Sequence, residues 1–87
     1  MATVFIPALM RKLTGGREKT IAHGRTVGQI IDDLERQFRG FRQQVLEDGE
    51  LKPSIAVSID GEIATGGLLD PVGESSEVHF VPAIGGG

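Results

Sequence analysis

The sequence predicts a single α+β domain, a roll in which a mixed sheet carries one main helix on one face. The segment from residue 26 to 39 has helical periodicity, and several shorter segments have the composition and alternation of strands. A single amphipathic helix must bury its apolar side, and the sheet is the only large partner for it. Eighty-seven residues allow one small domain, which we expect to span residues 1–82.

Two short strands near the N-terminus are expected to form a hairpin. Residues 3–8 are β-rich, and residues 19–23 follow a glycine-containing turn signal. Pro7 cannot donate a ladder hydrogen bond, so it should lie at the end of the first strand. Leu9 and Met10 are both expected to pack under the turn that follows.

The helix over residues 26–39 has a clear start and a clear apolar side. Thr26 is the expected N-cap, and Gln29 is expected to reach back to it in a capping box. The apolar residues recur at helical spacing, at Val27, Ile30, Ile31, Leu34 and Phe38. Asp32 and Asp33 are expected to be solvated helix charges.

The second half of the chain supplies the remaining strands. Phe41, Val45 and Leu46 suggest a short second helix or a turn, and residues 54–59 alternate with a period of two, as a half-buried strand does. Asp60-Gly61 is a hairpin turn pair that should lead into a short edge strand at residues 62–64. The last strand is predicted over residues 77–82.

The last strand also predicts a surface for partners. If alternate residues face the helix, His79 and Val81 face outward, and the same parity turns Phe5 outward on the first strand. In a roll of this order the first and last strands are commonly neighbours. We therefore expect an exposed apolar patch of Phe5, His79 and Val81, continued by Pro82, as a partner-contact surface.

Beyond the last strand, residues 83–87 are expected to form a flexible tail that ends in glycine. Glycine has no Cβ, so Gly85 and Gly86 are thin enough to thread a narrow channel behind Ile84. The terminal carboxylate of Gly87 is then the leading candidate for the reacting group. The alternative is a frayed terminus without a function.

Composition excludes several other functions. The chain has no cysteine, so disulfides, thiolate metal sites and a cysteine nucleophile are ruled out. His23 and His79 are far apart in sequence without a third ligand, and we predict no metal site. A net charge of −3 argues against a protein that binds nucleic acid. No apolar run is long enough for a membrane span, and the charges near the N-terminus are misplaced for a signal peptide; we expect a cytoplasmic protein without an active site of its own.

The sequence resembles the ThiS/MoaD family of sulphur-carrier proteins over nearly its whole length. The resemblance rests on the strand–strand–helix order and on three motifs: Thr26-Val27-Gly28, Gly66-Gly67-Leu68 and the segment from Glu77 to Gly87. It implies a β-grasp, ubiquitin-like fold. Within the family the pattern looks most like the CysO-type carriers, which serve cysteine biosynthesis.

The resemblance implies a mechanism centred on Gly87. An E1-like enzyme, which itself holds ATP and Mg²⁺, would adenylate the Gly87 carboxylate, and a sulphur source would convert it to a thiocarboxylate. Ile84, Gly85 and Gly86 would thread into the partner's active site. The chain would be a protein co-substrate without a bound cofactor.

The identity of the sulphur acceptor stays open at this stage. A CysO-type carrier would deliver to a PLP-dependent cysteine synthase, with a metallopeptidase releasing the product. The alternatives are the small subunit of molybdopterin synthase, inserted into the large subunit, and a ubiquitin-like modifier conjugated through Gly87. Ala83 stands where the molybdopterin subunits usually have a second proline.

Overall fold

The computed structural model describes residues 1–83, so Ile84, Gly85, Gly86 and Gly87 lie outside the described residues. A five-stranded sheet with the order β2-β1-β7-β5-β6 forms the centre of the molecule. The β1–β7 pair is parallel and the other pairs are antiparallel, so the sheet is mixed. Its strands are β1 (Ala2–Phe5), β2 (Lys19–Ala22), β5 (Ile55–Ile59), β6 (Glu62–Ile63) and β7 (Glu77–Pro82).

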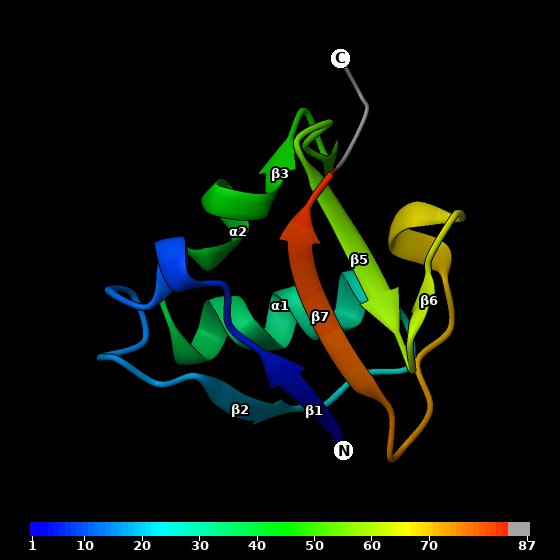
Figure 1. The fold of residues 1–87 in the computed structure, drawn as a ribbon, viewed down its shortest axis with the longest axis horizontal. Coiled ribbons are helices and arrows are strands. Elements are labelled where there is room, and N and C mark those ends of the chain that lie inside the picture. Colours follow the sequence, from blue (N-terminus) through cyan, green and yellow to red (C-terminus); the bar gives the residue numbers. More distant parts are fainter. Residues whose placement is uncertain (84–87) are drawn as a thin grey trace.

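One long helix crosses behind the sheet in Figure 1, and shorter elements fill the connections. The predicted roll, with its main helix on one face, is therefore observed. A two-stranded hairpin that the sequence did not predict occupies residues 46–51, directly after the second helix. The remaining elements are η1 (Ala8–Met10), α1 (Val27–Gln37), α2 (Phe41–Val45), β3 (Leu46–Glu47), β4 (Glu50–Leu51) and η2 (Gly67–Leu69).

The start of α1 follows the predicted capping pattern with one shift. The Thr26 hydroxyl oxygen accepts a hydrogen bond from the Gln29 N–H at 3.2 Å, which makes Thr26 the N-cap. The Gln29 side chain reaches back to the N–H of Arg25, at 2.8 Å, one residue before the expected partner.

α1 ends at Gln37, two residues earlier than predicted, and the Glu35 carboxylate binds the backbone that follows. Its oxygens accept hydrogen bonds from the N–H groups of Arg42, at 2.8 Å, and Gly40, at 3.2 Å. These bonds lower the pKa of Glu35. Gly40 has a φ of +98°, a conformation that glycine adopts without strain.

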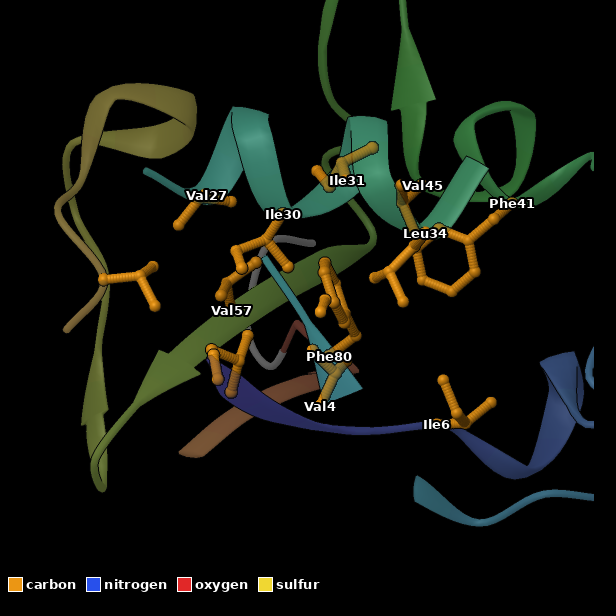
Figure 2. Packing of buried hydrophobic residues seen from close by; sticks show 14 of the residues in the cluster. Val4, Ile6, Val27, Ile30, Ile31, Leu34, Phe41, Val45, Val57 and Phe80 are labelled. Atoms are coloured by element: carbon orange, nitrogen blue, oxygen red, sulfur yellow. The ribbon is translucent and has the colours of Figure 1, made fainter. Parts of the chain in front are cut away.

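The core lies between α1 and the sheet (Figure 2). The apolar side of α1 and the inward residues of β1 and β7 are fully or almost fully buried, as is Val57 of β5, whereas Ile55 and Ile59 of β5 are partly buried. Phe41 of α2 packs edge-on against Phe80 of β7, with ring centroids 5.5 Å apart. The labelled core residues are Val4, Ile6, Val27, Ile30, Ile31, Leu34, Phe41, Val45, Val57 and Phe80.

Two further expectations from the sequence are wrong, and Leu9 is the first. Met10 is buried as predicted, but Leu9 is 94% exposed. The two residues share a single 3-10 turn, η1, whose neighbouring side chains point in different directions. Only one of them can reach the core.

The second correction concerns Asp33, which is buried and not solvated. Its carboxylate accepts hydrogen bonds from the His23 N–H at 2.9 Å, from Gln37 Nε2 at 3.1 Å and from Arg36 Nη2 at 2.6 Å. Burial by itself would raise the pKa of Asp33, but these donors and the Arg36 charge hold it below its usual value. Asp33 thus ties α1 to the end of β2.

Candidate functional site

The predicted tail leaves the body from β7, the middle strand of the sheet. β7 pairs with β1 on one side and with β5 on the other, so the expected neighbourhood of the first and last strands is confirmed. His79 lies opposite Phe5 in the parallel pair and opposite Ser58 in the antiparallel pair. The strand is therefore held along both edges.

The two sides of β7 face different surroundings. Val78 and Phe80 are buried against the helix side, whereas His79 and Val81 are half-buried on the opposite side. Phe5 is half-buried on that same side of β1. The predicted strand parity is confirmed, and we call Phe5, His79 and Val81 the open-face patch. Its role as a partner surface stays a prediction.

The rings of Phe5 and His79 stack on the open face. Their centroids are 4.2 Å apart and their planes are inclined by only 5°. Glu77 Oε1 lies 3.8 Å from His79 Nε2, so a protonated His79 has an anionic neighbour. The stack gives two adjacent strands a flat aromatic surface.

At the end of β7 the chain is still attached to the body. Pro82 is exposed and lies opposite Ile55 of β5. The N–H of Ala83, the first residue of the predicted tail, donates to the carbonyl of Ser54 at 2.9 Å. The body therefore controls where the last four residues begin.

A groove of about 360 Å³ opens next to this point and was missed by sequence reasoning. Its apolar lining includes Leu9, Met10, Phe80 and Pro82, and we call it the exit groove. The sequence analysis expected Leu9 to be buried with Met10, and no local pattern shows that η1 lies beside the ends of β5 and β7.

Two motifs behind the family resemblance meet at the first turn of α1. A Cβ at Gly28 would lie 3.3 Å from the carbonyl oxygen of Leu68 in η2, so glycine permits the close approach. The N–H of Gly66 donates to Asp70 Oδ2 at 2.7 Å and shapes the same loop. These residues support the fold and lie away from the open-face patch.

Within residues 1–83, no group of three or more histidine, cysteine, aspartate or glutamate side chains is arranged to hold a metal ion. Nor does this part of the chain contain a helix with the length and apolar character needed to cross a membrane.

The family comparison decides the relationship, because the model of the ThiS family matches residues 4–87. The chain belongs to the ThiS family. Its similarity to the sulfur carrier protein CysO of Mycobacterium tuberculosis reaches 31% identity over 90 residues, 98% of this chain and 97% of the relative. The small archaeal modifier protein 3 of Haloferax volcanii is 30% identical over 64 residues, which cover 71% of this chain and 70% of that protein.

A solved structure agrees with the sequence comparison. The fold matches a chain of the Amycolatopsis orientalis BexX/CysO complex with a TM-score of 0.92 and 34% identity, over 100% of both chains. This ThiS-family chain therefore has the β-grasp fold that the resemblance implied. That relative was crystallised in a complex with BexX.

Proposed function

We propose that this protein is a sulphur carrier whose Gly87 carboxylate is activated and converted to a thiocarboxylate. The observation that carries the proposal is the nearly full-length similarity to the sulfur carrier protein CysO, together with a family match that extends to residue 87. The position of Ala83 supports it, because Ala83 follows the central strand β7 and its N–H is bonded to the Ser54 carbonyl, so that a partner bound to the body would find the start of the tail in a defined place.

The proposed chemistry has two steps. In the first, a Gly87 carboxylate oxygen attacks the α-phosphorus of ATP on an E1-like enzyme that also holds Mg²⁺. An acyl-adenylate forms and pyrophosphate leaves. In the second, a hydrosulphide sulphur attacks the acyl carbon, and the bond to AMP breaks. Adenylation is needed because a free carboxylate has no good leaving group.

In this proposal the carrier supplies recognition, and its partners supply the catalytic groups. The open-face patch and Pro82 would contact the partner, while Ile84, Gly85 and Gly86 would occupy its channel. We favour a PLP-dependent cysteine synthase as the acceptor, with a metallopeptidase that releases the product, because of the similarity to CysO. A molybdopterin synthase large subunit is the alternative acceptor.

The test is the intact mass of the protein after incubation with its activating enzyme, ATP and sulphide. We expect a mass gain equal to the exchange of one oxygen for sulphur, located at Gly87 by fragmentation. An unchanged mass with an enzyme that is active on another carrier would contradict the proposal.

A second candidate, a protein modifier, is favoured by the similarity to the small archaeal modifier protein 3. The activation step would be the same, but a lysine amine would attack the acyl carbon in place of sulphide. Isopeptide-linked conjugates that disappear when Gly87 is deleted would support this function. Their absence in cells that accumulate thiocarboxylate would leave the sulphur carrier.

A further inference from the structure

The exit groove is an apolar hollow that the proposed function does not yet use. Leu9, at 94% exposed, stands beside the groove as one of the most exposed large apolar side chains in the part of the chain described. The buried side chains of Met10 and Phe80 also line it, as does Val81. Such a hollow can accept an apolar side chain from another molecule.

The groove opens where the chain leaves the body. Pro82 lines it and pairs with Ile55, another of its lining residues. Ser54 lines it too, and the Ser54 carbonyl accepts a hydrogen bond from the N–H of Ala83. Ala83, the last of the described residues, therefore lies at the edge of the groove.

Covalent geometry limits how far a partner can be from this point. Four residues separate Ala83 from the carboxyl group of Gly87, and a fully extended chain covers at most about 3.6 Å per residue, or about 14 Å in all. An enzyme that reacts with Gly87 must bring its active site within that distance of Ala83. Because the N–H of Ala83 is bonded to Ser54, which lines the exit groove, the surface around that active site then comes near the groove.

The charge of the groove indicates what this surface carries. Lys52 is the one charged side chain among the described residues that line the groove. It forms no ion pair with an acidic side chain within residues 1–83. A carboxylate on the partner would complement it.

We propose that the exit groove is the docking site for the enzyme that adenylates Gly87. That enzyme inserts an apolar side chain against Leu9 and places a carboxylate next to Lys52. The inference rests on the proposed function and extends the contact surface beyond the open-face patch, with which the groove shares Val81, to Leu9 and Lys52.

The test compares two serine variants of exposed leucines in the full chain. Leu9→Ser should raise the KM for the carrier in ATP–pyrophosphate exchange by about tenfold or more, since a buried leucine contact is lost. The kcat should not change, because the contact does not differ between ground state and transition state. Leu69→Ser is the matched control, since Leu69 is 84% exposed in η2 and does not line the groove. Both variants should melt at the wild-type temperature.

Lys52→Gln tests the electrostatic part separately. We expect the KM to rise about two- to fivefold at low salt, and the difference from wild type to vanish at high salt as the charges are screened. A salt-independent effect would contradict the proposed carboxylate.

The outcomes separate this inference from the proposed function. If the wild-type chain supports exchange and Leu9→Ser is indistinguishable from it, or if Leu69→Ser raises the KM as much, the docking site is wrong and the function stands. If the wild-type chain supports no exchange with its activating enzyme, both the proposed function and the proposed docking site are wrong.

Discussion

The two faces of the sheet are built from alternate residues of the same strand, yet their side chains differ in burial. On the covered face, Val78 and Phe80 pack against the helices and are almost fully buried. On the open face, His79 and Val81 remain half-buried, and His79 stacks on Phe5. From this difference in burial we predict that substitutions at neighbouring positions of β7 change stability and partner binding independently.

The largest effect should come from placing the same charge on each face. Val78→Asp buries an unpaired carboxylate and should cost about 3–5 kcal/mol, which approaches the whole stability of a small domain. Val81→Asp should cost about 1 kcal/mol, since its carboxylate can reach water. It should weaken partner binding instead. Chemical denaturation measures the stability of both variants, and equal losses would show that the two faces do not differ.

A smaller loss of stability is expected from a change at Asp33, which connects α1 to the end of β2 by a hydrogen bond. Asp33→Asn weakens three hydrogen bonds, and we expect about 1–3 kcal/mol of destabilisation at neutral pH. The pKa of Asp33 is lowered in the folded protein, so the unfolded chain binds the proton more readily. The stabilisation by Asp33 is therefore present above its ordinary pKa of 3.8 and is lost as the pH falls through the lower folded value.

Unfolding curves between pH 7 and pH 2 check this sign. The wild-type protein should lose stability below about pH 4, and Asp33→Asn should reduce the slope in that range. A variant with the wild-type slope would contradict the role of Asp33.

The aromatic stack on the open face should contribute less. A double-mutant cycle of Phe5→Ala and His79→Ala should give a coupling free energy of about 0.5–1.5 kcal/mol, as for other aromatic pairs. Coupling near zero would mean that the two rings lie together without stabilising each other.

The smallest effect on stability is expected in the tail. Gly86→Ala should leave the melting temperature unchanged and impair activation, because the added Cβ widens a segment that is proposed to enter a narrow channel. Activity equal to wild type would argue against that channel, and a large drop in melting temperature would show that the tail belongs to the body.

Local patterns predicted most of the fold. The bounds of β7 agree with the expected residues 77–82, and the Asp60-Gly61 turn has the positive φ values of its turn type. The strand parity and the N-cap at Thr26 follow from residues close in sequence. These features depend on periodicity and turn chemistry, which a single sequence contains.

The error at Leu9 is local to the η1 turn, whereas the other errors concern contacts between segments that are distant in sequence. The buried Asp33 carboxylate accepts a hydrogen bond from the N–H of His23, which lies ten residues earlier in the chain. The exit groove combines η1 with β5 and β7, and no local pattern reports that combination. The predicted reacting residue, Gly87, lies outside the described residues, so its role depends on an experiment.

That experiment compares the wild-type chain with a chain that carries one additional alanine after Gly87. Both are incubated with the activating enzyme, ATP and sulphide, and their intact masses are measured. We predict that both fold with the same melting temperature and that only the wild-type chain gains a sulphur atom. If the extended chain gains sulphur equally well, the Gly87 carboxylate is not the reacting group and the central claim is wrong.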